Sequence, residues 1–416
     1  MRTRADIPPR ILITNAEQRS MLATCRSLAE AGYRVSAIAF APRATAHYSR
    51  CCERRLHMTD PALDAERFIE ELAAELGRES YAALIPGSDT ALLTISGLRE
   101  RLRDLTRIGL PAHETVERSL DREALSAATT AVGLAAPTSI RCAGLQEATA
   151  AARDLGFPVI LKSVHTAERL DRTVDQGTPS QMIDTERELV DAIPSEGYEC
   201  LVQGVERGEP YSFGGLMIGG RLVALAMSHY RRTWPPHAGY AAFAETINPP
   251  PQLERTMQEL MREIGWQGIF ELELIRTAPD RFVPIDLNPR PYGSLALTVS
   301  AGAPLPALWC GWLLDPDGDP FGASLPVRAR AGYRYRWEDA DLRNVAWRLR
   351  HGRLAAALQT ARPRRRVTHA YFRLRDPLPL LVRSLDIASS RVEGAKAHSA
   401  PHATPAGRES EAPPVA

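Results

Sequence analysis

Short apolar runs alternate with amphipathic stretches over the first part of the chain. The runs are bounded by polar residues, as is typical of buried strands, and they lie at 11–14, 35–40 and 82–86. Two amphipathic stretches, at 17–30 and 65–76, carry apolar residues at helical spacing. Strands that alternate with helices in this way predict a small parallel α/β unit.

The third predicted strand is followed by the polar turn Pro86-Gly87-Ser88-Asp89. Ligands gather at the carboxyl ends of strands in α/β sheets, so this turn is a candidate ligand site. A plain turn is an equal alternative. No G-x-G-x-x-G follows the first strand, which disfavours a dinucleotide-binding oxidoreductase.

Further along the chain, the pattern changes to paired strands. A helix with a capping signal at Asp121 is predicted to run to Ala131. The segment GLMIGGRLVALAMSH predicts a β-hairpin, because Gly219-Gly220 separates two apolar runs. Residues 253–264 repeat apolar side chains at helical spacing and predict an amphipathic helix.

The composition is that of an ordinary globular protein. The 416 residues include 51 Lys+Arg and 50 Asp+Glu, a formal net charge of +1, and 44% of them are hydrophobic. This balance excludes a disordered, collagenous or acidic-tail protein and argues against a nucleic-acid partner. Only Lys162 and Lys396 are lysines. Codon bias toward arginine explains the other basic residues, but it leaves open why Lys162 remains.

Cysteine usage and the N-terminus indicate a compartment. The six cysteines form no C-x-x-C pair, and none has a histidine at metal-ligand spacing. The opening residues, MRTRADIPPR, lack the apolar core of a signal peptide. We therefore expect a cytoplasmic protein with reduced thiols.

One uncharged stretch has the length of a membrane span. Residues 291–314 carry no formal charge and are long enough to cross a bilayer. Prolines and glycines interrupt the stretch repeatedly. A buried loop and helix are therefore favoured over a membrane span.

The segment GIFELELIRTAPDRFVPIDLNPR predicts a hairpin that is rich in carboxylates. If TAPD is a four-residue loop, Arg276 pairs with Arg281. Glu271 then lies opposite Asp286, with Glu273 as the diagonal neighbour. Because side chains alternate faces along a strand, these carboxylates share one face with Asn288, two residues after Asp286.

Three carboxylates on one face repel one another unless a cation neutralises them. Ligation by oxygen alone suits Mg²⁺ or Mn²⁺, usually completed by substrate phosphates. A solvated polar sheet face is the alternative. The adjoining Asn288-Pro289-Arg290 favours the metal site, because it adds an amide oxygen and a fixed cation beside the acidic cluster.

The strand FPVILK ends in Lys162, one of the few lysines of the chain. A lysine is a compact point charge on a flexible stem and suits a phosphate oxygen. The alternative is a strand-end lysine that reaches solvent. A lysine retained in an arginine-rich chain favours function, and together with metal ligands it indicates nucleotide triphosphate chemistry.

Four motifs in this order resemble the ATP-grasp superfamily, and within it the branch of carbamoyl-phosphate synthase and the carboxylate–amine ligases. They are FPVILKS, LVQGVERGE, RRTWPPHAGYAAFAETI and ELELI…IDLNPRPYGS. The resemblance is strongest over 110–315. It implies an α/β fold in which an N-terminal parallel α/β unit precedes a two-lobed ATP-grasp domain with antiparallel sheets. A P-loop NTPase is disfavoured, because G-x-x-x-x-G-K-[ST] is absent.

The resemblance divides the chain into five segments. They are the N-terminal α/β domain, the small lobe, the large lobe with the metal site, an accessory segment, and a tail whose composition predicts disorder. Their bounds are 1–110, 111–200, 201–325, 326–395 and 396–416.

The resemblance assigns ATP contacts to positions that match the family motifs. Lys162 matches a lysine that contacts ATP phosphates, and Arg122 stands where a second such lysine is usual. The hinge strand that meets the adenine matches Gln203, Gly204 and Val205. The ribose hydroxyls are assigned to Glu209, with Glu206 as the alternative.

The same resemblance assigns the metal and catalytic positions. The ligands of Mg²⁺ or Mn²⁺ match Glu273, Asp286 and Asn288. Glu271 is left as a supporting or substrate-binding group. Arg290 matches an arginine that stabilises charge on the transferred phosphoryl group or on the tetrahedral intermediate, and Lys162 is its catalytic companion.

The chain departs from the family pattern in two loops. The phosphate-covering loop, 163–177, is charged rather than Gly-rich, and His165 is either a phosphate contact or incidental. The second loop carries Arg231, Arg232, Trp234 and His237, and it is either a grip on a phosphate or carboxylate or a surface loop.

The resemblance implies an ATP-dependent carboxylate–amine ligase that forms an acyl phosphate and releases ADP and phosphate, in a biosynthetic pathway. The alternatives are an enzyme that forms carbamoyl phosphate or carboxyphosphate, and a degenerate nucleotide-binding regulator. The partners would be a small carboxylic acid and an amine, such as an amino acid, and a homodimer is one possibility. Candidate substrate contacts are Ser88, Asp89, Arg231, Arg232, Glu271, Tyr292 and Ser294.

Overall fold

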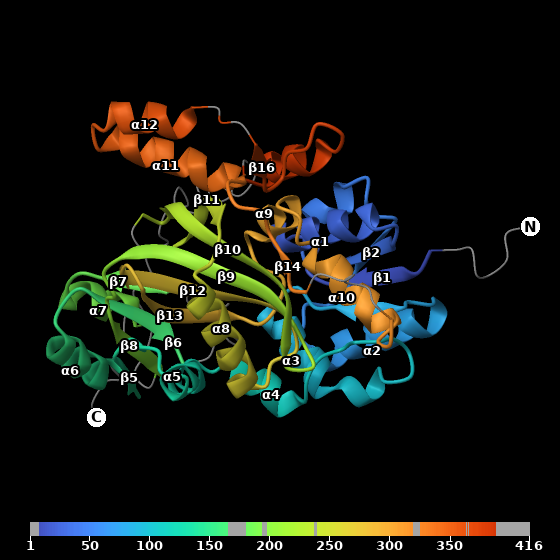
Figure 1. Ribbon diagram of the computed structural model, residues 1–416, viewed down its shortest axis with the longest axis horizontal. Coiled ribbons are helices and arrows are strands. Elements are labelled where there is room, and N and C mark those ends of the chain that lie inside the picture. Colours follow the sequence, from blue (N-terminus) through green and yellow to red (C-terminus); the bar gives the residue numbers. More distant parts are fainter. Residues whose placement is uncertain are drawn as a thin grey trace, which may run out of the picture.

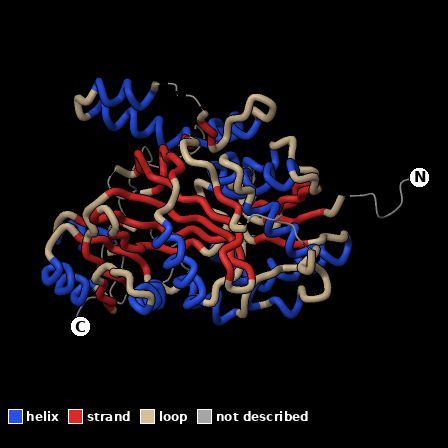
Figure 2. The backbone as a smooth tube through the Cα atoms, viewed as in Figure 1, coloured by secondary structure: helices blue, strands red, loops and turns tan. Residues whose placement is uncertain are grey.

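The computed structural model describes residues 8–164, 180–193, 198–236, 239–318, 325–362, 364 and 366–387. Three sheets lie side by side with helices around them (Figures 1 and 2). The first belongs to the N-terminal part of the chain, and the other two belong to the middle. Both the mixed α/β class and the presence of antiparallel sheets confirm the predicted fold class.

The N-terminal sheet is parallel and has the strand order β3-β2-β1-β4. The strands are β1 (Arg10–Ile13), β2 (Arg34–Ala39), β3 (Arg54–His57) and β4 (Ala83–Ile85). The helices and short turns of this unit are α1 (Arg19–Glu30), η2 (Thr45–Tyr48), α2 (Ala65–Arg78), α3 (Asp89–Gly97) and η3 (Arg99–Arg101). Strands β1, β2 and β4 and both predicted helices are confirmed. The edge strand β3 was not predicted, because its half-buried polar sequence RRLH lacks an apolar run.

A small antiparallel sheet follows, with the strand order β5-β8-β6-β7. The strands are β5 (Ser139–Cys142), β6 (Val159–Ser163), β7 (Gln181–Ile183) and β8 (Cys200–Gly204). The helices before and around this sheet are α4 (His113–Leu120), α5 (Arg122–Ala131), α6 (Leu145–Leu155) and α7 (Glu186–Ala192). The capping signal at Asp121 is confirmed, because its carboxylate accepts from the backbone N–H groups of Glu123 and Ala124.

The largest sheet has the order β13-β12-β9-β10-β11-β15-β16, and β14 pairs with β10. Its strands are β9 (Glu209–Ile218), β10 (Arg221–Trp234), β11 (Tyr240–Ile247), β12 (Gly268–Ala278), β13 (Arg281–Asn288), β14 (Val327–Arg328), β15 (Arg334–Arg336) and β16 (Val367–His369). The predicted β9–β10 hairpin turns at Gly219-Gly220, both with positive φ, as expected of a tight turn.

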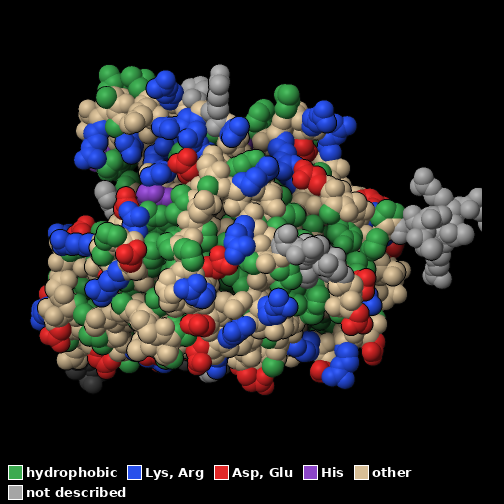
Figure 3. Space-filling view, viewed as in Figure 1, with side chains coloured by type: hydrophobic (Ala, Val, Ile, Leu, Met, Phe, Trp, Pro, Cys, Tyr) green, Lys and Arg blue, Asp and Glu red, His purple; other side chains and the backbone are tan. Residues whose placement is uncertain are grey.

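Helices cover the large sheet and continue into the C-terminal segment. They are α8 (Pro251–Ile264), α9 (Leu295–Ser300), α10 (Leu305–Leu314), α11 (Glu338–Arg350) and α12 (Leu354–Ala361). The predicted helix at 253–264 is α8, whose apolar stripe packs on the core formed by β9, β10 and β12. The α11–α12 hairpin stands at one end of the molecule, where many basic side chains gather (Figures 1 and 3).

The uncharged stretch at 291–314 forms α9 and α10, which are largely buried between the N-terminal unit and the large sheet. This confirms the predicted buried loop and helix. Among the residues that the structure describes, none of the helices is both long and apolar enough to cross a membrane.

The carboxylate hairpin is β12–β13, but its predicted register is wrong. Glu273 pairs with Asp286, and Glu271 pairs with Asn288. The turn is tighter than predicted, because Ala278 already pairs with Arg281, and this shifts the register by two residues. Two bulge-like irregularities shift it by one residue in opposite directions and cancel. Asp286 therefore lies opposite Glu273 in place of Glu271, while the four oxygen-bearing side chains stay on one face.

Candidate active site

Four oxygen-bearing side chains gather on one face of the β12–β13 hairpin. The paired positions place the carboxylate of Glu273 opposite Asp286 and that of Glu271 opposite Asn288. The Asn288 amide donates to Glu271 Oε2 at 3.3 Å. The opposite face of β12 carries Phe270, Leu272 and Leu274, which lie in the hydrophobic core. The alternation of the strand therefore fixes the acidic cluster on the side away from that core.

Glu271 is the most deeply buried member of the cluster, at 3% exposure. Its Oε1 accepts from the hydroxyls of Tyr230 at 3.0 Å and Ser294 at 3.1 Å. Burial raises its pKa, whereas these hydrogen bonds favour the carboxylate form. Because its oxygens already have protein donors, Glu271 supports the cluster from behind, and Ser294 is its partner.

Glu273 is only partly buried and has a strongly perturbed pKa. Burial, followed by the charges of Glu271 and Asp286, raises the pKa of Glu273 to about 8. Lys162 and Arg290 act in the opposite direction. A carboxylate in this position is short of positive charge, and a bound cation would supply it.

The donor set fits a hard divalent cation. Asp286 Oδ1 is buried and makes no hydrogen bond within the described residues, and its nearest cation, Arg122 Nε, is 3.6 Å away. Within those same residues, no three His, Cys, Asp or Glu side chains enclose an ion by themselves. Two carboxylates and the amide oxygen of Asn288 therefore form a partial set that phosphate oxygens would complete, as Mg²⁺ sites commonly require.

Lys162 projects from strand β6 of the small sheet to the β12–β13 hairpin. Its side chain is buried, at 5% exposure, and Nζ donates to the carbonyl oxygen of Ile285 at 2.7 Å. Burial lowers its pKa, and the charges of Asp286 and Glu273 raise it again. The ammonium thus lies beside the acidic cluster, as its assignment as a phosphate contact requires.

Arg122 reaches the same place from the first position of α5. It donates to the Ser163 carbonyl oxygen at 2.6 Å and to the Ser163 hydroxyl at 3.3 Å. Its Nε faces Asp286 at the distance given above. The structure therefore brings Arg122, Lys162 and Asp286 together, which the sequence implied only through the family pattern.

The hinge residues lie at the end of β8. Gln203 Nε2 donates to the Ser139 hydroxyl at 2.9 Å, and the Gly204 N–H donates to the Thr138 carbonyl oxygen at 2.9 Å. Val205 and Glu206 follow and are partly buried. Glu209 is exposed at the start of β9 and pairs with Arg276.

Arg290 is held by the N-terminal unit. Its Nε and Nη2 donate to the two Asp89 oxygens at 2.6 and 3.0 Å, and Nη2 also reaches Asn288 Oδ1 at 3.3 Å. Asp89 begins α3, whose N-cap is Ser88. Sequence reasoning named Asp89 and Arg290 as candidates but missed their pairing, because the pair joins positions far apart in the chain.

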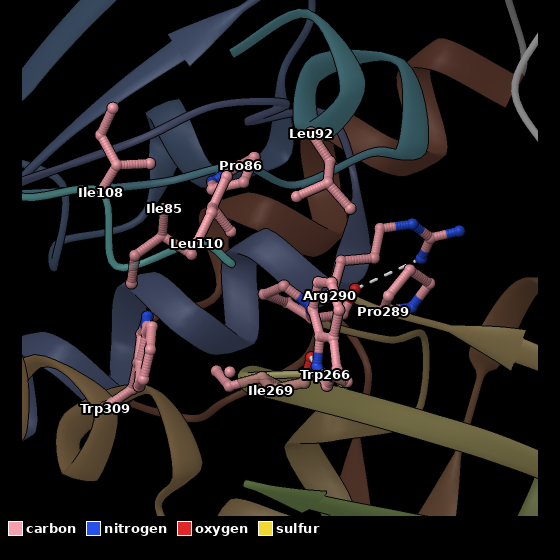
Figure 4. Close-up of a pocket in the computed structure, with 12 residues that line it drawn as sticks. Ile85, Pro86, Leu92, Ile108, Leu110, Trp266, Ile269, Pro289, Arg290 and Trp309 are labelled. Atoms are coloured by element: carbon pink, nitrogen blue, oxygen red, sulfur yellow. Dashed lines mark hydrogen bonds between the residues drawn. The ribbon is translucent and has the colours of Figure 1, made fainter. Parts of the chain in front are cut away.

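The same junction is apolar beneath the arginine. Figure 4 shows Arg290 at the edge of a small pocket lined by Ile85, Leu92, Leu110, Trp266, Ile269 and Trp309. The pocket therefore lies between apolar residues of the N-terminal unit and of the large sheet.

Three further predicted substrate contacts also have protein partners. Tyr292 is buried, and its hydroxyl forms a hydrogen bond with that of Thr298. Arg232 makes an ion pair with Asp341 of α11 at 2.8 Å, and Arg231 is exposed beside Glu245. His237 of the same loop lies outside the described residues. So do His165 and nearly all of the 163–177 loop.

Two residues beside the site, Arg19 and Trp337, were not found from the sequence. Arg19 begins α1, and its guanidinium carbon lies 3.8 Å from the centroid of the Trp337 ring and 5.7 Å from that of Tyr240. Arg19 is one arginine among many, and Trp337 lies in a segment without a clear pattern. No local signal identified either residue.

No protein-family model matches the chain. The chain is 31% identical over 154 residues to the carbamoyl phosphate synthase large chain of Pseudomonas syringae pv. tomato, a match over 34% of this chain and 13% of that protein. Its identity to the corresponding protein of Thermus thermophilus is 31% over 147 residues, or 33% of this chain and 13% of that protein. The chain thus spans a small part of these relatives.

Solved structures match over most of the chain. The L-amino acid ligase from Bacillus licheniformis aligns with a TM-score of 0.58 at 13% identity, over 74% of this chain and 75% of that one. The ADP complex of purK, N5-carboxyaminoimidazole ribonucleotide synthetase, aligns with a TM-score of 0.57 at 14% identity, over 79% and 81%. The biotin carboxylase–ATP complex from Campylobacter jejuni aligns at 0.56 and 15%, over 80% and 75%. At such identities the likeness shows a shared fold.

Proposed function

We propose that this chain, which has the ATP-grasp fold, is an ATP-dependent carboxylate–amine ligase. A substrate carboxylate would attack the γ-phosphorus of ATP and form an acyl phosphate. An amine would then displace phosphate from the acyl carbon and form an amide. ADP and phosphate are the other products. The substrates are small molecules, and we keep a cytoplasmic location and a homodimer as parts of the proposal.

One observation carries the proposal: a buried lysine from one lobe meets an oxygen-rich acidic hairpin from the other. Lys162 lies on β6 and donates to the carbonyl oxygen of Ile285 on the hairpin. Its charge acts to lower the pKa of Glu273, and the charge of Asp286 acts to raise the pKa of Lys162. A cation on each side of a phosphate chain is the arrangement that phosphoryl transfer uses, because charge on the phosphates must be offset. Two of the similar structures were solved as nucleotide complexes.

The proposed nucleotide site uses both lobes. Lys162 and Arg122 would hold phosphate oxygens, and the backbone at Gln203, Gly204 and Val205 would meet the adenine. Of the two candidates for the ribose, Glu206 is favoured, because the carboxylate of Glu209 already forms an ion pair with Arg276. Either carboxylate can accept from ribose hydroxyls.

The proposed metal ligands are Glu273, Asp286 and Asn288. The free oxygen of Asp286 and the raised pKa of Glu273 support this set. When bound there, Mg²⁺ or Mn²⁺ would offset charge on the phosphates and orient them. Glu271 would stay behind this set, held by Tyr230 and Ser294.

Arg290 is the proposed catalytic arginine. Asp89 fixes its guanidinium with two hydrogen bonds, so its position is set before substrate arrives. A preorganised cation of this kind stabilises charge that develops on the phosphoryl group or on the tetrahedral intermediate without reorganising.

A second candidate function is the formation of carboxyphosphate from bicarbonate. The curated relatives are carbamoyl phosphate synthase large chains, which favours this reading. The two functions separate in a single assay, because only the second requires bicarbonate in place of a carboxylic acid.

The direct test is ADP release by purified protein against a matrix of carboxylic acids and amines, with and without bicarbonate. We expect Lys162→Ala and Asp286→Ala to abolish substrate-dependent ADP release while circular dichroism stays unchanged. Arg67→Ala, on the exposed face of α2, is the matched control and should retain full activity. Hydroxylamine should trap the acyl phosphate as a hydroxamate. Full turnover in both site variants would refute the site, and ADP release without a hydroxamate would refute the acyl phosphate.

A further inference from the structure

Arg19 is a cation without an acidic partner at the edge of the proposed active site. Among the described residues, no carboxylate lies within ion-pair distance of its guanidinium. Two acids, one close to Arg19 along the chain and one next to Trp337, already accept hydrogen bonds from other groups. Glu17 accepts from the Phe40 N–H and the Asn15 amide, and Glu338 accepts from backbone N–H groups of 370–372.

The guanidinium of Arg19 is held in place on three sides. Trp337 stacks under it at 3.8 Å, and the Tyr240 ring lies at 5.7 Å. Arg19 Nε donates to the Gly293 carbonyl oxygen at 3.1 Å, and Tyr335 donates to the same oxygen at 3.0 Å. A guanidinium stacked on an aromatic face keeps its outer N–H groups in one plane, which suits two parallel hydrogen bonds to a carboxylate.

Gly293 leaves the space that the arginine needs. A Cβ added at this glycine would lie 2.3 Å from Arg19 Nη2, so any larger residue would displace the guanidinium. Gly293 belongs to the loop that follows the Asn288–Arg290 motif. The loop that follows Arg290 therefore meets the N-terminal unit at Arg19.

The loop after Arg290 connects this arginine to the acidic cluster. Gly293 accepts a hydrogen bond from Arg19, and the next residue, Ser294, donates to Glu271. Tyr240, whose ring borders Arg19, is 53% exposed. A group bound to Arg19 would therefore lie beside the loop that carries Arg290.

We propose that Arg19, stacked on Trp337, is the receptor for a substrate carboxylate that does not react. This inference rests on the proposed ligase function and narrows its substrates. The reacting carboxylate must reach the phosphates beside Lys162, so the one at Arg19 is a second anionic group. Either the amine substrate is an amino acid, or the acid substrate is a dicarboxylic acid. Arg290 does not serve this purpose, because its Nε and Nη2 already donate to the two Asp89 oxygens.

Ligand binding tests the receptor separately from catalysis. Tryptophan fluorescence of the full chain, with Mg²⁺ and a non-hydrolysable ATP analogue, is followed during titration with four kinds of ligand. They are L-amino acids and their amides, C3–C5 dicarboxylic acids, the monoesters of those acids, and inorganic phosphate. We expect at least one amino acid or dicarboxylic acid to bind, and the blocked amide or ester to bind at least tenfold more weakly. Binding by an amino acid identifies the amine substrate as the carrier, and binding by a dicarboxylic acid identifies the acid.

Three variants and a control complete the design. Arg19→Gln should weaken the carboxylate ligand at least tenfold and remove the preference over its amide. Gly293→Ala should do the same by displacing the guanidinium, and Arg19→Lys should retain part of the affinity. Arg330→Gln is the matched control, because Arg330 also stacks on an aromatic ring, Tyr333, and donates to a backbone carbonyl, yet its side chain is exposed. It should leave binding unchanged.

The outcomes separate the receptor from the proposed function. Tight binding of phosphate in place of carboxylates, equal binding of acid and amide, or an unchanged preference in Arg19→Gln would overturn the receptor even if the wild type releases ADP with a substrate pair. So would the absence of any carboxylate ligand. A carboxylate preference that depends on Arg19 without ADP release from any pair would support the receptor and refute the ligase function.

Discussion

The charged form of Glu273 is disfavoured by the surroundings of its side chain. Its neighbours Glu271 and Asp286 are acidic, and burial adds to the cost of its charge. Without a cation the pKa of Glu273 is raised to about 8 from an ordinary value of 4.5, so the protonated form is favoured at any pH below that. A site that binds a divalent cation tightly must hold such carboxylates close together, so the metal-free state bears this cost.

The raised pKa of Glu273 predicts how stability depends on pH. The folded chain binds a proton there that the unfolded chain has released between pH 4.5 and 8. Stability from this group is therefore complete below about pH 4.5 and is lost as the pH rises toward 8. In EDTA, the free energy of unfolding should fall by at least about 1 kcal/mol over this window. Urea denaturation at a series of pH values measures the fall.

Variants test whether Glu273 causes this pH dependence of stability. Glu273→Gln should flatten the pH dependence, and Mg²⁺ with ATP should reduce it, because a cation favours the carboxylate. Glu66→Gln, on the exposed face of α2, should leave the slope as it is. An equal slope in wild type and Glu273→Gln would mean that another group titrates.

Sequence reasoning could find a residue whose type is unusual in this chain. Lys162 stood out in an arginine-rich chain, and the structure places it beside Asp286. Arg19 could not be found in this way, because its role depends on Trp337, more than three hundred residues later. The Asp89–Arg290 pair had the same obstacle. Long-range packing creates such sites, and composition and spacing do not report it.

At the scale of elements, the hairpin register shows the limit of pattern reasoning. Alternation correctly placed the four oxygen-bearing side chains on one face of β12–β13, since the period of a strand is local. Their pairing was wrong, because the loop has two residues in place of the predicted four, which shifts the register by two, while the two bulge-like irregularities cancel each other. Alternation has the same period for either loop length, so it does not report the register.

The neighbouring strand β9 predicts a further element-scale effect. A Cβ at Gly214 would lie 2.2 Å from the hydroxyl oxygen of Tyr292, a buried side chain bonded to Thr298. Gly214→Ala should therefore push Tyr292 and the loop after Arg290, cost about 1–3 kcal/mol of stability and lower ADP release.

The control is another glycine in an open position. A Cβ added at Gly77, in α2, would have no neighbouring atom within 4 Å. Gly77→Ala should raise stability by about 0.5–1 kcal/mol and leave activity unchanged. Urea denaturation and the ADP assay compare the two variants. Equal stability of Gly214→Ala and wild type would show that Tyr292 yields without strain.

At the scale of the whole molecule, the C-terminal segment binds back onto the N-terminal unit. Arg26 of α1 donates to Asp376 at 2.9 Å and to the Tyr371 carbonyl oxygen at 2.8 Å, and Ser49 donates to Asp376 at 2.7 Å. The segment also supplies Trp337 to Arg19. The proposed substrate receptor therefore depends on a segment that lies outside the motifs of the fold.

The buried Arg26–Asp376 pair predicts how much the molecule depends on this closure. Arg26 and Asp376 are 2% and 5% exposed, so removing one partner leaves the other charged, buried and uncompensated. Asp376→Ala should cost about 3–5 kcal/mol in urea denaturation, whereas the isosteric apolar double variant Arg26→Met/Asp376→Leu should recover much of that loss. Glu199→Ala, which breaks an exposed pair with Arg141, should cost no more than about 1 kcal/mol. If Asp376→Ala cost as little as Glu199→Ala, the C-terminal segment would not be held by this pair, and its apolar contacts would have to hold Trp337 against Arg19.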